Sequence, residues 1–300
     1  MELVETESDR HFGVIKEDAM IYVGVTGWGD HDLLYTTPEE RKHKLSTYAG
    51  HFPTVEIDST FYAIQPVKNF EKWDAETPDH FQFVVKVSRE MSGHDREPKT
   101  PLIELFERYR VSVDPLKQAG KLRAVLVQLP PWFDVSKPHL DYLRTLRAEL
   151  SDYAIAIEFR NPTWFSEAFR DRTLQFLKEQ RFINTICDEP QTKESSIPFV
   201  PVVTHPEVAV VRLHGRNTSG WLKKPGMTSQ EWRHVRCLYR YSEEELQELA
   251  TSLREIDREA KDVYVYFNNN SAGDAAPNAK RLIEILGLEY ELAPRQISLF

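Results

Sequence analysis

Charged side chains two residues apart lie at the ends of several short apolar runs in this sequence. The pairs are Glu56 with Asp58, Glu158 with Arg160, and Arg212 with His214. Residues two apart on a strand share one face, so both members of a pair can project into one pocket. Buried charges are costly unless paired, and packing alone does not require them at strand after strand. The repetition therefore predicts a functional site, although one pair such as Glu158 and Arg160 is also typical of a structural ion pair.

Four residues at these strand ends are candidates for catalysis. Glu56 and Glu158 could act as general acid and general base, and His214 could carry a proton near neutral pH. Lys86 ends another apolar run. It could assist electrostatically, or form a Schiff base if burial lowers its pKa. This set predicts an enzyme, with hydrolysis as one reaction that it could catalyse.

The predicted substrate is a small anion. Lys86, Arg160 and Arg212 place three cations at separate strand ends, and the planar fork of arginine suits phosphate or carboxylate groups. The other residues predicted to bind substrate follow a strand or lie in a long loop: Trp28, Asp58, Tyr62, Gln128, Asp188, Trp221, Asn268 and Asn269. The three aromatic residues among them could stack on a sugar or a base, although most aromatic side chains pack in cores or loops. An anionic, phosphorylated, or sugar- or nucleotide-like molecule is therefore expected.

The sequence requires no cofactor. Only two cysteines occur, and neither belongs to a CxxC pair, which disfavours a cysteine-based zinc site and a disulfide framework. Of the ten histidines, only His94 and His214 fall at strand exits, so an imidazole-rich zinc centre is not expected. The alternative that stays open is a single Mg²⁺ or Mn²⁺ held by Glu56, Glu158 and Asp188, because hard cations accept carboxylate oxygens.

Eight short apolar runs alternate with helical stretches, which is the pattern of βα units around a parallel sheet. The runs lie at residues 21–25, 54–57, 81–87, 124–129, 154–159, 182–186, 208–213 and 263–267. Several are continuously apolar, as expected for strands covered on both faces. A chain of 300 residues can form one such barrel. The sequence therefore predicts a single-domain α/β protein with a TIM (β/α)₈ barrel, and another kind of α/β sheet is the alternative.

Helices are predicted between these strands. They lie at residues 38–48, 66–75, 137–150, 171–180, 242–259 and 277–286. Thr37 followed by Pro38 and Glu40 is typical of a helix start, and Ser242 with Glu245 matches a capping box. Two long irregular stretches, 188–206 and 214–241, follow strands and are candidate pocket walls. The expected organisation is an N-terminal extension at 1–20, the barrel at 21–290, and a C-terminal tail at 291–300.

Seven segments resemble successive signatures of the domain-of-unknown-function 72 family, also called YecE-like proteins. They read GVTGWGD, VEIDSTFYA, FVVKVSREMSGHDR, VLVQLPPWF, AIEFRNPTWF, VVRLHGR and YVYFNNNSAGDAAPNAKRL, in family order, from about Ile21 to Leu286. The resemblance implies a TIM barrel and no established activity. The chain departs from the family pattern at Val25 and Thr26, where the family commonly has Thr-Ser. It also has Asp58 where the family has asparagine, which adds a carboxylate to the predicted pocket.

Charge and hydropathy restrict the partners. The net charge of −9 repels nucleic-acid phosphates, so direct nucleic-acid binding is disfavoured. No secretory apolar region and no run of about 20 apolar residues is present, so we expect a cytoplasmic protein with no membrane partner.

The chain ends in QISLF, which resembles the pentapeptide by which bacterial replication and repair proteins dock on the sliding clamp. Gln296 would supply a polar anchor, and Leu299 and Phe300 would fill an apolar groove. Alternatively, both apolar side chains pack on their own barrel. Besides an enzyme, the sequence therefore leaves open a clamp-associated DNA-maintenance factor and a non-catalytic metabolite-binding protein.

Overall fold

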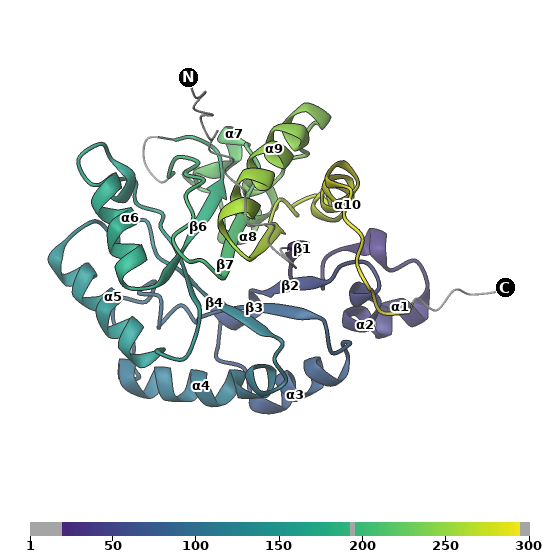
Figure 1. Cartoon of the computed structure of the whole chain (residues 1–300), viewed down its shortest axis with the longest axis horizontal. Coiled ribbons are helices and arrows are strands. Elements are labelled where there is room, and N and C mark those ends of the chain that lie inside the picture. The colour runs from purple at the N-terminus through teal and green to yellow at the C-terminus, as the bar shows by residue number, and fades with distance from the viewer. Residues whose placement is uncertain (1–19, 193–195, 295–300) are drawn as a thin grey trace, which may run out of the picture.

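The computed structural model describes residues 20–192 and 196–294, which form a closed barrel of eight parallel strands (Figure 1). The strands follow chain order around the barrel, and the last closes it by pairing with the first. They are β1 (Met20–Thr26), β2 (Thr54–Ile57), β3 (Gln82–Lys86), β4 (Leu122–Gln128), β5 (Ile155–Glu158), β6 (Phe182–Asp188), β7 (Val208–Leu213) and β8 (Asp262–Phe267). Each predicted apolar run overlaps one strand. The prediction of a single-domain α/β barrel is therefore confirmed.

Helices surround the sheet, with α3 to α6 along one side of the view in Figure 1 and α9 and α10 along another. The helices are α1 (Pro38–Lys42), α2 (Lys44–Ala49), α3 (Val67–Ala75), α4 (Leu102–Gln118), α5 (Lys137–Glu149), α6 (Arg170–Glu179), α7 (Thr218–Trp221), α8 (Ser229–Arg236), α9 (Glu243–Glu259) and α10 (Ala275–Leu286). Short 3-10 helices are η1 (Asp32–Leu34), η2 (Ser59–Phe61) and η3 (Pro162–Phe165). The capping boxes predicted at Thr37 and Ser242 are both present and begin α1 and α9.

The helix prediction differs from the structure in three places. The stretch predicted at 38–48 is two helices, because His43 leaves the helical conformation with φ −115° and ψ 50°. Helix α4 was not predicted; it contains Pro115, a residue that usually interrupts helices. The irregular stretch predicted at 214–241 contains α7 and α8, and α8 begins at a capping box formed by Thr228 and Glu231.

The connection between β6 and β7 contains no helix in its described residues. Its later part covers β6 through hydrogen bonds instead: the Asn184 amide donates to the Val200 carbonyl oxygen at 3.1 Å, and the Thr204 hydroxyl donates to the Phe182 carbonyl oxygen at 2.7 Å. The prediction of an irregular stretch at 188–206 agrees with this.

Two apolar clusters make up the core. The larger lies between the strands and the helices, and the smaller fills the barrel interior with side chains such as Val84, Leu126, Val210 and Tyr266. Successive side chains of a strand point to opposite faces. Residues two positions beyond the interior side chains, such as Arg212 beyond Val210, therefore also point inward, at the carboxyl end of the barrel.

Gly24 allows β1 and β2 to lie close together inside the barrel. A Cβ atom at this position would lie 2.2 Å from the Thr54 carbonyl oxygen. Gly24→Ala is expected to destabilise the fold by about 1–3 kcal/mol through overpacking, as measured by chemical unfolding. Gly29→Ala is the control, because its added Cβ would have nothing within 4 Å. Equal stability of the two variants would contradict this account.

Residues 1–19 and 295–300 lie outside the described residues, and with them most of the predicted extension and the clamp-binding residues Gln296, Leu299 and Phe300. The described start of the tail contacts the barrel, since the Ala293 amide donates to the Ala49 carbonyl oxygen at 3.1 Å. None of the helices in the described ranges combines the length and apolar character needed to span a bilayer.

Candidate functional site

Arg212 lies at the centre of a buried ion-pair network at the carboxyl end of the barrel. Its Nε and Nη2 atoms donate to both carboxylate oxygens of Glu56, at 2.7 and 2.8 Å, and its Nη1 atom donates to Glu158 at 2.5 Å. All three side chains are at most 1% exposed. Such fork-to-carboxylate bonds fix geometry as well as charge. The network thereby joins side chains from β2, β5 and β7.

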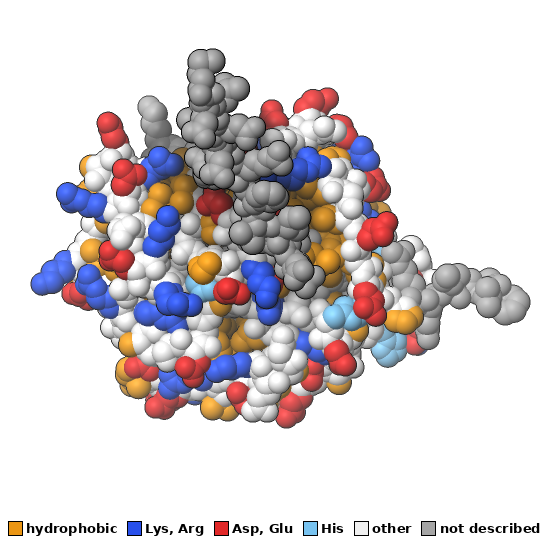
Figure 2. Space-filling view, viewed as in Figure 1, with side chains coloured by type: hydrophobic (Ala, Val, Ile, Leu, Met, Phe, Trp, Pro, Cys, Tyr) orange, Lys and Arg blue, Asp and Glu red, His pale blue; other side chains and the backbone are white. Residues whose placement is uncertain are grey.

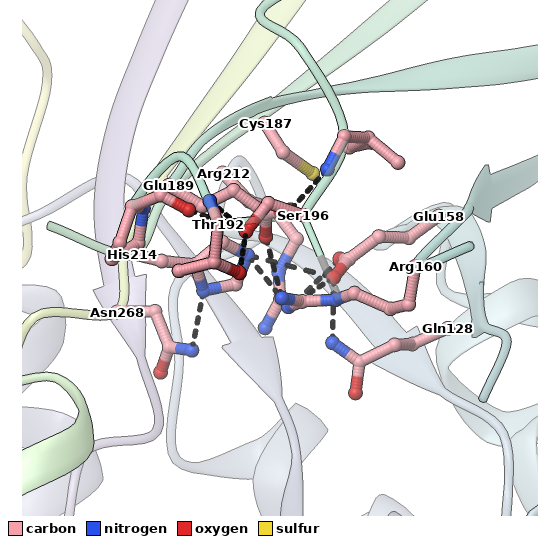
Figure 3. Close-up of polar contacts among 12 residues, drawn as sticks. Gln128, Glu158, Arg160, Cys187, Glu189, Thr192, Ser196, Arg212, His214 and Asn268 are labelled. Carbon is pink, nitrogen blue, oxygen red and sulfur yellow. Dashed lines mark hydrogen bonds and ion pairs between the residues drawn. The ribbon is translucent and has the colours of Figure 1, made fainter. Parts of the chain in front are cut away.

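Arg160 extends the network toward the β6–β7 connection (Figure 3). Its Nη2 atom lies 2.5 Å from Glu158 Oε1, and its Nη1 atom lies 2.5 Å from Glu189 Oε2. The other oxygen of Glu189 accepts the Ile197 amide at 2.8 Å. Glu158 therefore binds two guanidinium groups, and each guanidinium group binds two carboxylates.

The two arginines determine the charge of Glu158. Burial acts to raise the pKa of this carboxyl, but the Arg160 and Arg212 guanidinium groups outweigh it and hold the pKa well below its usual range. Glu56 has Arg212 and Lys86 as its stabilising charges, and burial raises its pKa in spite of both. Glu158 is therefore ionised at neutral pH, which makes it a poor proton donor.

His214 is neutral in this network. Its Nε2 atom lies 3.0 Å from Arg160 Nη2, and a guanidinium group can only donate, so Nε2 must accept. The proton then lies on Nδ1. The Asn268 atom placed 3.0 Å from it is Nδ2, which can only donate, so this tautomer requires the Asn268 amide to turn its Oδ1 atom toward His214 (Figure 3). Burial, followed by the charge of Arg160, lowers the pKa of His214 well below its usual value.

Lys86 is held differently from the two arginines. Its Nζ atom donates to Gln128 Oε1 at 2.8 Å, and Gln128 Nε2 donates to Glu158 Oε1 at 2.6 Å. The ammonium group also lies 4.5 Å from the centre of the Phe61 ring. It forms no ion pair with any carboxylate of the described residues. Burial, followed by the charge of Arg212, lowers the pKa of Lys86 to about 8.

The donor set does not fit a divalent cation. Glu158, Cys187 and His214 lie close enough together to share an ion. However, both oxygens of Glu158 and the Nε2 atom of His214 face guanidinium groups, which would repel it. Burial raises the pKa of the Cys187 thiol well above its usual value, so it carries no charge. The predicted magnesium or manganese ligand set fails as well, because Asp188 bonds Arg216 and Tyr241 instead of joining Glu56 and Glu158.

Strand alternation explains which predicted residues lie outside the network. Asp188 follows Cys187, an inward position, and therefore points away from the barrel axis toward Arg216. Asn269 bonds the Tyr239 carbonyl oxygen and Asn278, on the outer side of β8. Trp28 packs edge-on against Trp73 of α3, with ring centres 5.3 Å apart. These three side chains position neighbouring loops and helices.

An open cleft of about 830 Å³ adjoins the network at the ends of β8, β1 and β2. Two predicted residues, Asp58 and Asn268, line it together with Thr26, and Asn268 connects it to His214. Oxygen-bearing side chains dominate the wall, including Asp30 and Asp32. Tyr62 packs edge-on against Phe61, with ring centres 5.6 Å apart, and its side chain is 58% exposed. On the face in Figure 2, Lys and Arg side chains are interspersed with Asp and Glu side chains.

Helices α7 and α8 with the loop between them, residues 218–236, form what we call the lid. Trp221 is its contact with the network: its ring centre lies 5.2 Å from the Arg160 guanidinium carbon and 6.1 Å from the His214 ring centre. Trp221 is 2% exposed, so the lid excludes solvent from this part of the network. Access to Arg160 from this side therefore requires the lid to move.

Glu189 and Arg236 were not predicted as site residues, and His94 was noted only as a histidine at a strand exit. Glu189 follows Asp188 and continues the inward face of β6, so strand alternation could have identified it. His94 lies edge-on to Phe61, with ring centres 4.9 Å apart, and burial, followed by the charge of Lys86, lowers its pKa to about 4. His94 and Arg236 belong to long connections, where no sequence period indicates direction.

Comparison with known proteins places the chain in a family. The family described as "Protein of unknown function DUF72" matches residues 22–298. The UPF0759 protein YunF of Bacillus subtilis (strain 168) is 48% identical over 284 residues, which cover 94% of this chain and 100% of YunF. The UPF0759 protein YecE of Escherichia coli (strain K12) is 27% identical over 184 residues, covering 60% of this chain and 62% of YecE.

Solved structures agree with this placement. A DUF72 family protein from Enterococcus faecalis V583 matches with a TM-score of 0.85 and 38% identity, covering 93% of this chain and 100% of that one. Another, from Thermotoga maritima MSB8, matches with a TM-score of 0.75 and 30% identity, covering 90% and 100%. The resemblance inferred from the sequence is thereby confirmed, and this chain belongs to the DUF72 family.

Proposed function

We propose that the protein is an enzyme that acts on a small polyhydroxylated anion, such as a sugar phosphate or a nucleotide, at the carboxyl end of the barrel. Lys86 binds the negative charge in this proposal. The side chains around the adjoining cleft bind the hydroxyl groups.

The environment of Lys86 is the observation that carries the proposal. An ammonium group can donate three hydrogen bonds, and Gln128 is its one acceptor among the described residues. The two arginines of the network, by contrast, each bind two carboxylates. Glu56 and Glu158 stabilise its charge only from a distance, without an ion pair, and burial still lowers its pKa. Burying a charge without a carboxylate in contact costs stability, so packing does not account for this lysine. An anion beside Nζ would supply both the acceptors and the opposite charge.

The cleft supports the polyhydroxylated part of the substrate. Carboxylates and amides such as Asp58, Asp32 and Asn268 line it, and these groups accept and donate hydrogen bonds to hydroxyls. Lys44 also lines the cleft, but three aspartates, Asp30, Asp32 and Asp58, outnumber it, so the cleft disfavours a bare anion. The charged end of the ligand therefore belongs at Lys86 and the neutral end belongs in the cleft.

Proton transfer is the reason to propose an enzyme rather than a binding protein. A general acid or base works best with a pKa near the working pH. Lys86, at about 8, meets this condition, whereas Glu158 and His214 are held far from it. Glu56, Glu158 and His214, which the sequence singled out for catalysis, would then position Lys86 and its ligand through Gln128 and the arginines.

The proposal is tested by identifying the ligand and then its conversion. Small molecules that copurify with the full chain are identified by mass spectrometry, and a panel of sugar phosphates and nucleotides is assayed for products. Lys86→Met is expected to lower kcat/KM at least about 100-fold, within the range of lost acid–base catalysis. Lys117→Met, on the exposed side of α4, serves as the control. Ligands that bind without yielding product would indicate a metabolite-binding protein, and unchanged turnover by Lys86→Met would contradict the proposal.

A further inference from the structure

Three buried N–H donors without an acceptor lie together where the lid meets the barrel. They are Arg160 Nε, Trp221 Nε1 and Arg236 Nε, none of which has a hydrogen-bond partner among the described residues. The Trp221 ring contacts both arginines: its centre is 5.2 Å from the guanidinium carbon of Arg160 and 4.5 Å from that of Arg236. Arg160 and Trp221 are 4% and 2% exposed. Native structures rarely leave buried donors unsatisfied, so a group of three needs an explanation.

Arg236 also lacks an opposite charge. Its guanidinium group stacks on Trp221 and on Trp232, at 4.5 and 4.7 Å from the ring centres. Within residues 20–192 and 196–294 it forms no hydrogen bond and no ion pair. Burial, followed by the charge of Arg160, lowers its pKa to about 10. Arg160 binds two carboxylates nearby, so Arg236 is the cation of this region that a further anion would neutralise.

We propose that Arg236, Arg160 and Trp221 form an oxyanion subsite beneath the lid, and that this subsite binds the phosphoryl group of a phosphate ester. A phosphoryl group offers three acceptor oxygens in different directions, which suits three donors from three side chains. A carboxylate offers two oxygens in one plane and suits a single arginine fork. The inference deepens the proposed function by naming a second anchor of the same substrate, and it rests on that proposal for the identity of the ester.

A phosphoryl group bound at this subsite would contact both the lid and the barrel. Trp221 and Arg236 belong to α7 and α8, whereas Arg160 follows β5. A phosphoryl group that bonds residues of both would hold the lid against the barrel. Lid closure with a bound substrate excludes water from the site, as in many barrel enzymes.

Calorimetric titration of the full chain with inorganic phosphate tests the inference. We expect binding by the native protein, at least tenfold weaker binding by Arg236→Met, and a partial recovery by Arg236→Lys, which restores charge without the fork. Trp221→Phe keeps an aromatic ring and removes the Nε1 donor, so the phosphate affinity should fall a few-fold. Lys224→Met makes the same charge change at an exposed position of the lid and should bind phosphate like the native chain.

The outcomes separate this inference from the proposed function. Phosphate affinity unchanged in a folded Arg236→Met variant, or no phosphate binding by the native chain, would overturn the subsite. Acetate bound as tightly as phosphate would overturn the choice of a phosphoryl group. Turnover that survives Lys86→Met would instead contradict the proposed function and leave the Arg236 result standing. Thermal unfolding of each variant shows whether a loss of binding reflects a loss of folding.

Discussion

Replacing Lys86 with methionine is expected to stabilise the protein at pH 7 by about 3 kcal/mol. The pKa of Lys86 falls from 10.5 to about 8 on folding, and a difference of this size corresponds to about 3 kcal/mol. Because the unfolded chain keeps its proton between these two pH values while the folded chain loses it, the native protein should become more stable as pH rises from about 8 to 10.5. Below pH 8 the folded protein carries the full free-energy cost of burying the charged ammonium group. The methionine variant should lack this rise.

Lys121 provides the matched control for this prediction, because it is also a buried lysine. Its Nζ atom lies 2.6 Å from Asp74 Oδ1 and donates to two carbonyl oxygens, those of Asp74 and Thr77. Lys121→Met should therefore destabilise the protein, since it leaves these acceptors without their donor. Urea unfolding at several pH values measures both variants. Destabilisation by Lys86→Met would show that Lys86 stabilises the fold and would remove the reason for assigning it a ligand.

Glu158→Gln is expected to destabilise the protein by about 3–5 kcal/mol, because it removes a charge that two buried guanidinium groups share. Arg212 would keep its ion pair with Glu56, and Arg160 would keep its ion pair with Glu189. The variant therefore loses only the two ion pairs that Glu158 forms. Glu284→Gln is the control, because the Glu284 side chain is 63% exposed in its ion pair with Arg281. Exposed ion pairs contribute about 0–1 kcal/mol to stability. Denaturant unfolding that gave similar values for the two variants would contradict the network described for Glu158.

Strand alternation accounts for how much of the site the sequence could predict. Glu56, Glu158 and Arg212 are far apart in the chain, yet their inward positions at strand ends predict that they meet, and the structure brings them together. The same alternation points Asp188 outward and Glu189 inward. The sequence analysis nevertheless predicted Asp188 as a substrate-binding residue, because it considered only that Asp188 lies at a strand end. The chemistry of these residues was predictable, but their pairing into a network of two arginines and three carboxylates was not.

The long connections explain what the sequence could not predict. His94 and Arg236 reach the site from the β3–α4 and β7–α9 connections, whose paths depend on packing against the finished barrel. Capping residues such as Thr228 could have indicated α8 but not its position over Trp221. The predicted clamp-binding tail lies outside the described residues, so that partner stays a prediction.

The proposed function requires that the buried ammonium group of Lys86 binds an anion. Nitrogen NMR of the protein labelled at the lysine side chains measures its pKa directly, with Lys86→Met identifying the signal. We predict a pKa of about 8 in the free protein and a higher value when an anionic ligand is bound, because the added negative charge stabilises the ammonium form. A pKa near the ordinary 10.5 that does not respond to any ligand would contradict the account.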